Sequence, residues 1–256
     1  MVRPKKHYGQ HFLKDKNIAG KIVRALDPSK YDYLVEVGPG TGFLTDFLID
    51  LPLKLILIEK DEEAYEFLKK KYKDKHIQII HGDFLKTDLA ALSRNAPMGI
   101  IGNFPYNIST QIVFKILENR LLVPEAVGMF QTEVAERIAA QPGSKVYGIL
   151  SVLTQLFYQV KILFSVPPGV FVPPPKVHSA VLKMERKENM PEVDFDELKK
   201  LVKTAFNQRR KTLRNSLKSI NLPLEKPWTE FMSKRAEELA PGDFLKLYDL
   251  MQRDAK

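Results

Sequence analysis

Short apolar runs alternate with amphipathic stretches along the first half of the chain. YLVEV (33–37), LKLILIE (53–59) and MGIIG (98–102) have the length and the Val, Ile and Leu content of buried strands, whereas DEEAYEFLKKKYK (61–73) and STQIVFKILEN (109–119) carry apolar residues at helical spacing. Strands that alternate with helices indicate a mostly parallel sheet with helices on both faces. We therefore expect an α/β fold.

A proline-rich segment interrupts the pattern in the second half of the chain. YGILSVLTQLFYQVKILFSV (147–166) predicts a helix that passes into a strand, and HSAVLKMER (178–186) predicts another strand. Between them PPGVFVPPPKV (167–177) holds five prolines in eleven residues, and because proline cannot continue a helix we expect a stiff, extended loop. Helical periodicity follows to the end, which predicts a main domain of residues 1–189 and an appended helical domain of residues 190–256.

The charge of the chain favours a polyanionic partner. Lys and Arg number 40 against 31 Asp and Glu, and residues 199–218 hold eight Lys or Arg and no acid. The helical pattern of that segment predicts a basic helix that contacts nucleic-acid phosphates. The predicted RNA-binding residues are Lys5, Lys6, Arg209, Arg210, Lys211, Arg214 and Lys218.

The composition excludes several classes of site. The absence of cysteine excludes disulfides, thiolate nucleophiles and cysteine-ligated zinc, and the five histidines lack the spacing of metal ligands, so we expect no metal. No run of 18 apolar residues occurs, and the basic N-terminus has no apolar core of signal-peptide length. We expect a cytoplasmic protein and, by default, a monomer.

A glycine-rich turn follows the first strand of the alternating pattern. VEVGPGTGFL places Gly38, Gly40 and Gly42 between a strand and a helix, where glycine lets the backbone approach a ligand closely. The spacing is GxGxG, and it is neither the GxGxxG of dinucleotide-binding proteins nor the GxxxxGK that holds a triphosphate. The turn therefore predicts a ligand site without naming the ligand.

Polar residues end the next three strands and narrow the choice of ligand. Glu59, Asp83 and Asn103 each follow an apolar run, so they are expected at the same edge of the sheet. One carboxylate can accept hydrogen bonds from both ribose hydroxyls and the other from an adenine amino group. Acidic residues here, Glu36 included, would repel a pyrophosphate and tolerate a cation, which points to the sulfonium of S-adenosylmethionine.

The segment GNFPYN predicts a site for an adenine amino group. Acceptors at the Asn103 side-chain oxygen and the Phe104 main-chain carbonyl would draw the amine toward tetrahedral geometry, with its lone pair aimed at a methyl group. Pro105 fixes the turn, and Tyr106 offers a face on which a base can stack. A base inside a duplex cannot reach such a site, so the target must be unpaired or flipped. Phe171 is the predicted second wall of the stack.

Motifs along nearly the whole chain resemble those of the KsgA (RsmA) type of ribosomal RNA adenine dimethyltransferase family. They are GQHFL (9–13), EVGPGTG (36–42), GNFPYNIST (102–110), QTEVAERIAAQPGSKVYGILSV (131–152) and FVPPPKVHSAV (171–181). The resemblance implies a Rossmann-like class I methyltransferase sheet whose last strand is antiparallel. It also implies dimethylation of two adjacent adenosines in a hairpin loop near the 3′ end of small-subunit (16S) ribosomal RNA, in the pre-30S particle, with S-adenosylhomocysteine as product and a role in subunit biogenesis.

The resemblance also supplies site residues. It implies that His11 and Leu13 close over the cofactor and that Gly38 lies beneath it. Many relatives have Asn in place of His11 and Leu in place of Phe104, and the second change is harmless if the main-chain carbonyl acts. The predicted cofactor-binding residues are Gln10, His11, Leu13, Glu36, Gly38, Gly40, Glu59, Lys60, Asp83, Phe84 and Asn103.

Three other functions remain open from the sequence. The fold and cofactor would also suit the large-subunit ribosomal RNA dimethyltransferase of macrolide resistance, although the motifs at 131–152 and 171–181 favour the small-subunit enzyme. A non-catalytic ribosome-assembly factor could keep the same fold, and a similar tetrapeptide serves DNA adenine methylation. No proton-abstracting residue is expected, because the methylated adenine cation is acidic enough to lose its proton to water.

Overall fold

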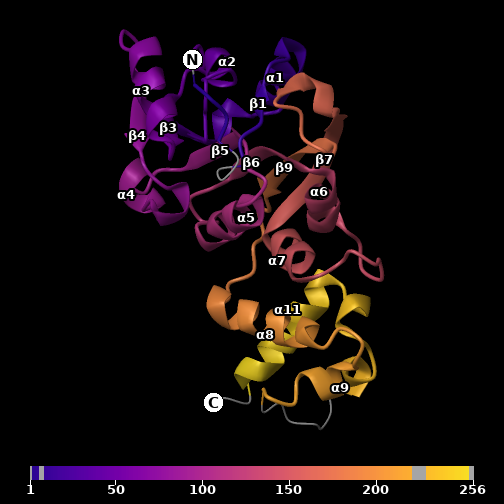
Figure 1. Ribbon diagram of the computed structural model, residues 1–256. Helices are drawn as coiled ribbons and strands as arrows, with labels where there is room; N and C mark the ends of the chain where they lie inside the picture. The colour runs from indigo at the N-terminus through magenta and orange to yellow at the C-terminus, as the bar shows by residue number, and fades with distance from the viewer. Residues whose placement is uncertain (1, 6–8, 221–228, 254–256) are drawn as a thin grey trace. The chain divides into compact units, whose positions relative to one another are not determined.

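The computed structural model describes residues 2–5, 9–220 and 229–253 (Figure 1). They form two compact units, one of residues 1–135 and 160–186 and the other of residues 136–159 and 187–256. Relative to the expected division near residue 190, the second unit also takes in residues 136–159.

The first unit is built on a seven-stranded sheet of order β4-β3-β2-β5-β6-β9-β7. Strands β2 to β6 are parallel, and β9 pairs with β6 antiparallel, which confirms the α/β class and the antiparallel last strand. The strands are β2 (Tyr33–Val37), β3 (Lys54–Glu59), β4 (Gln78–His81), β5 (Met98–Asn103), β6 (Glu125–Gln131), β7 (Tyr158–Val166) and β9 (Ser179–Arg186).

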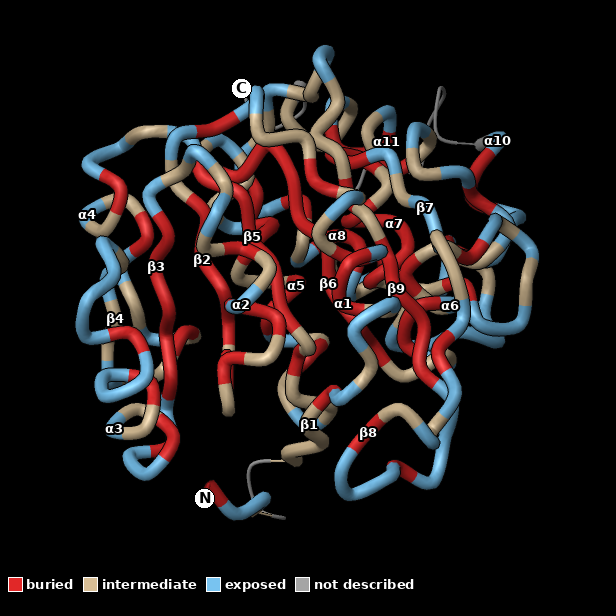
Figure 2. The backbone as a smooth tube through the Cα atoms, turned by 90° about the horizontal axis from the view of Figure 1, so that it is seen from above, coloured by how far each residue is buried: buried red, intermediate tan, exposed pale blue. Residues whose placement is uncertain are grey.

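Helices cover both faces of this sheet. Figure 1 shows α1, α2 and α3 on one side of the strands and α4 and α5 on the other. Figure 2 shows the central strands buried along most of their length, as the continuous apolar runs of a doubly covered parallel sheet require. The helices are α1 (Lys16–Val23), α2 (Thr45–Leu48), α3 (Glu62–Lys71), α4 (Leu89–Ser93), α5 (Ser109–Glu118) and α6 (Thr132–Ala139), with single turns η2 (Pro28–Lys30) and η3 (Phe84–Lys86).

A second, two-stranded sheet joins the N-terminal segment to the proline-rich loop. In this sheet β1 (Phe12–Leu13) pairs antiparallel with β8 (Phe171–Val172). The loop also contains one 3-10 turn, η4 (Pro168–Val170), where an extended chain is expected; proline is tolerated because it stands at the first position of the turn. The pairing brings two segments that are far apart in sequence to the same edge of the unit.

The second unit is helical. Helix α7 (Ile149–Phe157) passes directly into β7, as predicted, and the remaining elements are α8 (Phe195–Asn207), α9 (Leu213–Ser216), α10 (Thr229–Met232), η5 (Ala236–Glu238) and α11 (Pro241–Arg253). The ring of Phe206 stacks on Phe244 with centroids 5.9 Å apart, and the Tyr147 hydroxyl donates to the Leu239 carbonyl at 2.9 Å. The buried residues of α8 are Phe195, Leu198, Leu201, Val202 and Ala205.

The basic run is not one helix, and that prediction is wrong. Helix α8 ends at Asn207, so Arg209, Arg210 and Lys211 lie in the connection to α9. The reason is local: no apolar residue occurs between Phe206 and Leu213, so a continued helix would have nothing to pack in its next turn.

Candidate active site

A cavity opens at the carboxyl ends of β2, β3 and β5, under the N-terminal segment. Twelve of the predicted residues line it: Gln10, His11, Gly38, Gly40, Glu59, Lys60, Asp83, Phe84, Asn103, Phe104, Pro105 and Tyr106. The cavity is therefore built where polar residues end the parallel strands, as the alternating pattern predicts.

The glycine-rich turn and Glu59 hold each other in place. Gly40 has a φ of +59°, its N–H donates to Glu59 Oε2 at 2.9 Å, and a Cβ there would lie 2.7 Å from the Phe12 ring. The other oxygen of Glu59 accepts from the Asp61 N–H at 2.8 Å. Burial raises the pKa of Glu59, and these two N–H donors, together with the N–H of Lys60, oppose that shift. Of the about four acceptor positions of a carboxylate, one is therefore left for a ligand.

The N-terminal segment is tied to the first turn of α3. Asp61, 1% exposed, accepts from Lys5 Nζ at 2.5 Å, from Gln10 Nε2 at 3.3 Å and from the Glu63 N–H at 3.0 Å. Burial acts to raise the pKa of Asp61, but these donors lower it overall. The ammonium of Lys5 is bound here to a buried carboxylate while its side chain is 32% exposed, and RNA binding by Lys5 stays a prediction. Lys6 lies outside the described residues.

Sequence reasoning missed Phe12 and Asp61. Phe12 lines the cavity and covers Gly40, and Asp61 holds the segment that carries Phe12. The only signal for Asp61 is its position before an acidic helical turn, which is typical of an N-cap. Phe12 belongs to a two-residue strand, which is too short to show an alternating pattern.

Asp83 follows β4 and forms an ion pair with Lys60, which follows β3. Its Oδ2 accepts from Lys60 Nζ at 2.8 Å, and its Oδ1 accepts from the Leu85 N–H at 3.0 Å. Burial acts to raise the pKa of Asp83, but the hydrogen bond and charge of Lys60 lower it overall. Asp83 is thus an ionised acceptor at the cavity wall.

Asn103 is fixed in one orientation by the N-terminal segment. Its Nδ2 donates one N–H to the His11 carbonyl at 2.7 Å, which sets the orientation of the amide and leaves Oδ1 as the atom that can accept from a ligand. The Phe104 ring is buried and meets Phe130 edge to face at 5.1 Å, in space that only a glycine at 128 leaves, since a Cβ there would lie 2.1 Å from the ring. The ring packs in the core while the residue lines the cavity.

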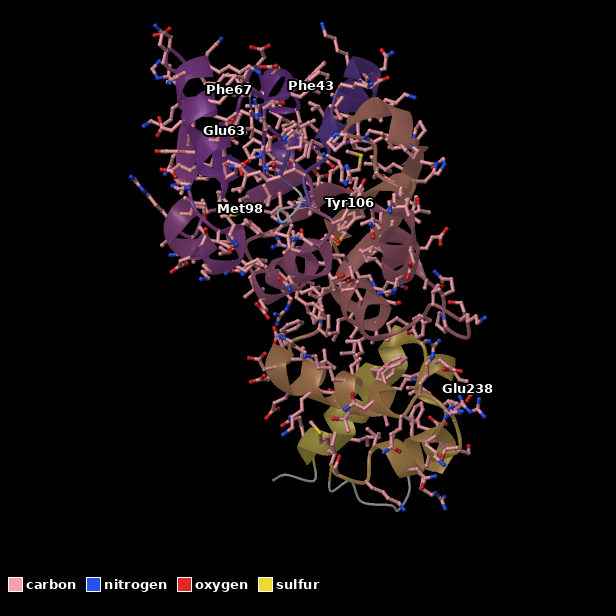
Figure 3. All side chains as sticks on the ribbon, in the orientation of Figure 1. Phe43, Glu63, Phe67, Met98, Tyr106 and Glu238 are labelled. Carbon is pink, nitrogen blue, oxygen red and sulfur yellow. The ribbon has the colours of Figure 1, made fainter. Side chains whose placement is uncertain are left out.

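Tyr106 is held at its hydroxyl and on its ring (labelled in Figure 3). Its hydroxyl pairs with Ser179 Oγ at 2.5 Å, and the His11 ring lies against its ring with centroids 5.5 Å apart and planes at 29°. The His11 ring is itself bound through Nδ1, which donates to the Pro173 carbonyl at 2.7 Å. Burial raises the pKa of the Tyr106 phenol, so it remains neutral at pH 7.

Three predicted residues do not line the cavity. Glu36 is 2% exposed and accepts from Thr45 Oγ1 at 2.6 Å, so it braces the start of α2 and does not face a cofactor. Leu13 and Phe171 are paired across the two-stranded sheet, and both are buried in the hydrophobic core. The prediction that Phe171 stacks on a base is therefore wrong for this structure, because its ring has no accessible face.

The basic residues of the second unit differ in their surroundings. Arg209 Nε pairs with Glu237 Oε2 at 2.7 Å, and its Nη2 donates to the Ser144 carbonyl at 3.3 Å, so Arg209 has partners within the unit and its RNA binding stays a prediction. Arg210, Lys211, Arg214 and Lys218 are exposed.

The described residues include neither a candidate metal site nor a candidate membrane span. Ranges 2–5, 9–220 and 229–253 contain no group of three or more His, Cys, Asp or Glu side chains that could hold a metal ion. Within the same ranges, no helix is long and apolar enough to cross a membrane.

Comparison with known proteins agrees with this geometry. Residues 1–253 match the family described as ribosomal RNA adenine dimethylase. The chain is 50% identical to the ribosomal RNA small subunit methyltransferase A of Flavobacterium johnsoniae, over 99% of this chain and 97% of that one, and 48% identical to the protein of that name from Bacteroides thetaiotaomicron, over 100% and 97%.

Two solved structures are similar to this chain over nearly its whole length. A dimethyladenosine transferase from Plasmodium falciparum has a TM-score of 0.83 at 31% identity, over 96% of this chain and 98% of that one. The 23S rRNA methyltransferase ErmE has a TM-score of 0.74 at 22% identity, over 94% and 99%, and shares the fold. The chain belongs to the ribosomal RNA adenine dimethylase family.

Proposed function

We propose that this protein transfers methyl groups from S-adenosylmethionine to the amino groups of two adjacent adenosines in a hairpin loop near the 3′ end of small-subunit ribosomal RNA. The observation that carries the proposal is the fixed amide of Asn103, whose Oδ1 is left to accept from an amine beside the Phe104 carbonyl. The names of relatives that are 48% to 50% identical over nearly the whole chain support the small-subunit substrate.

The cavity residues suit S-adenosylmethionine. The acceptor position that remains on Glu59 fits a ribose hydroxyl, and Asp83 fits the adenine amino group. Gly38 and Gly40 line the cavity with φ of +66° and +59°, a left-handed backbone conformation that glycine adopts without strain. When bound, the cofactor supplies an electrophilic methyl group on a sulfonium.

The residues of the chain then activate the amine without a base. Two acceptors, Asn103 Oδ1 and the Phe104 carbonyl, take the two N–H groups of the unmethylated amine and align its lone pair. After one methylation a single N–H remains, so one acceptor loses its partner and the second methyl needs room. The cavity side of Pro105 and Tyr106 provides the surface against which the base lies.

RNA binding is assigned to the exposed cations of the second unit. Arg210, Lys211, Arg214 and Lys218 lie in or after the connection that follows α8, and none of the residues 199–218 is acidic. Such a cluster binds phosphates and not bases, so it positions the RNA while Tyr106 and Asn103 recognise the extruded adenine.

One assay separates this function from its alternatives. Radiolabelled S-adenosylmethionine is offered with small subunits that lack the methyl groups, with large subunits and with duplex DNA. We expect label in the small subunits alone, as dimethyladenosine, and none with Asn103→Ala. Label in large subunits or in DNA would refute the substrate assignment, and subunit binding without any label would support an assembly factor.

A further inference from the structure

The hydroxyl pair formed by Tyr106 and Ser179 links the predicted base site to the first residue of β9. The two oxygens are 2.5 Å apart, Ser179 is fully buried, and Ser179 does not line the cavity. We propose that Ser179 is a positioning residue of the reaction, which acts through Tyr106 by fixing the ring on which the target adenine stacks. This inference rests on the proposed function.

The axis of the Tyr106 ring depends on its hydroxyl. Tyr106 lies in the connection between β5 and α5 and is only partly buried. The position of its ring depends on two side-chain torsions: χ1 sets the direction of the ring axis, and χ2 sets the rotation of the ring about that axis. The phenolic oxygen lies on the axis from Cβ through the ring, and a hydrogen bond there therefore fixes the direction of the axis. Rotation about that axis is limited separately by the His11 ring, which lies against the Tyr106 ring.

Ser179 is suited to hold this axis because its own backbone is fixed. It is paired with Gln131 of β6, and the preceding carbonyl, of His178, accepts from the Thr132 N–H at 3.0 Å. The anchor thus belongs to the main sheet, whereas the surface it controls belongs to a connection. Tyr106 and His11 both line the cavity, so a tilt of the ring would move the plane against which a base is held relative to Asn103 Oδ1.

A double-mutant cycle tests the role. Ser179→Ala and Tyr106→Phe each remove one hydroxyl of the pair and keep the rest of the side chain. We expect each to lower kcat/KM about threefold to tenfold, the range for loss of a hydrogen bond of ordinary net strength, and the double variant to be no worse than either. Ser165→Ala is the matched control, because Ser165 Oγ donates only to the Ser179 carbonyl, at 3.5 Å, and not to Tyr106.

A second measurement distinguishes positioning from general destabilisation. An RNA hairpin with 2-aminopurine at the target position loses fluorescence when the base stacks on an aromatic ring. We expect weaker quenching with Ser179→Ala than with wild type at saturating protein, with unchanged cofactor affinity. Additive losses in the cycle, or wild-type activity and quenching in Ser179→Ala, would overturn the proposal. If Ser179→Ala fails to fold, Tyr106→Phe with wild-type turnover and quenching would overturn it equally. A wild-type protein inactive on small subunits would instead refute the proposed function.

Discussion

Replacement of Glu36 by Gln tests how the start of α2 is held. Glu36 is 2% exposed and accepts from Thr45 Oγ1 at 2.6 Å, and burial raises its pKa from 4.5 to about 8. At pH 7 the group is therefore mostly protonated, so it adds little negative charge beside the cavity. Gln keeps the oxygen that accepts from Thr45 and cannot ionise, and it therefore resembles the protonated side chain.

The sign and size of the effect follow from the two pKa values. Because the folded-state pKa is above the unfolded value, the stability that the proton contributes is fully present below pH 4.5 and is lost as the pH rises through about 8. At about 1.4 kcal/mol per pKa unit, the free energy of unfolding falls by at most about 5 kcal/mol across this interval. Burial also raises the pKa of Glu59, which adds a loss of the same sign in both proteins.

Urea unfolding between pH 5 and pH 9 measures the difference. We expect Glu36→Gln to match wild type near pH 5 and to exceed it by about 2 to 5 kcal/mol near pH 9. Glu66→Gln is the control, since Glu66 is exposed and pairs only with Lys69 across one helical turn. A stability difference between Glu36→Gln and wild type that does not change with pH would refute the reasoning.

Three further changes address the cofactor, the RNA and the core. Lys5→Met removes the ion pair with buried Asp61. It should weaken cofactor binding about threefold to tenfold by calorimetry, with an unchanged circular dichroism spectrum. Unaltered affinity would mean that this ion pair does not hold the N-terminal segment over the cavity. The double change Arg210→Ala and Arg214→Ala should weaken RNA binding and reduce the slope of log affinity against log salt concentration by about 0.7 to 0.9 for each lost contact. An equal fall in cofactor affinity would contradict the assignment of RNA binding and cofactor binding to different residues. Phe104→Leu should keep activity and lose about 1 kcal/mol in thermal unfolding, whereas large loss of turnover in the folded variant would show that the ring, and not the carbonyl, acts.

The sequence predicts the features of this site that depend on local pattern. Parallel strands place their carboxyl ends at one edge, so the positions of Glu59, Asp83 and Asn103 follow from the alternation of runs alone. The glycine-rich turn is likewise a local feature, because a positive φ at Gly38 and Gly40 requires glycine.

The features that it does not predict depend on contacts between distant segments. Pairing of Leu13 with Phe171 joins two-residue strands that have no periodic signal, and it buries a ring that a local reading leaves available for stacking. Glu36 belongs to a strand that is covered on both faces, so alternation does not tell which way its side chain points. The side chain faces Thr45, and only the packing of α2 decides this.

A crystal structure of the protein with S-adenosylhomocysteine and an RNA hairpin that carries the unpaired adenosines would test the central claim most directly. We predict that the target amine lies within hydrogen-bond distance of Asn103 Oδ1 and the Phe104 carbonyl, with the base stacked on Tyr106 and the cofactor sulfur opposite the lone pair of the amine nitrogen, in line with the path of the methyl group. An adenine bound elsewhere, or one whose amine contacts neither oxygen, would contradict the account.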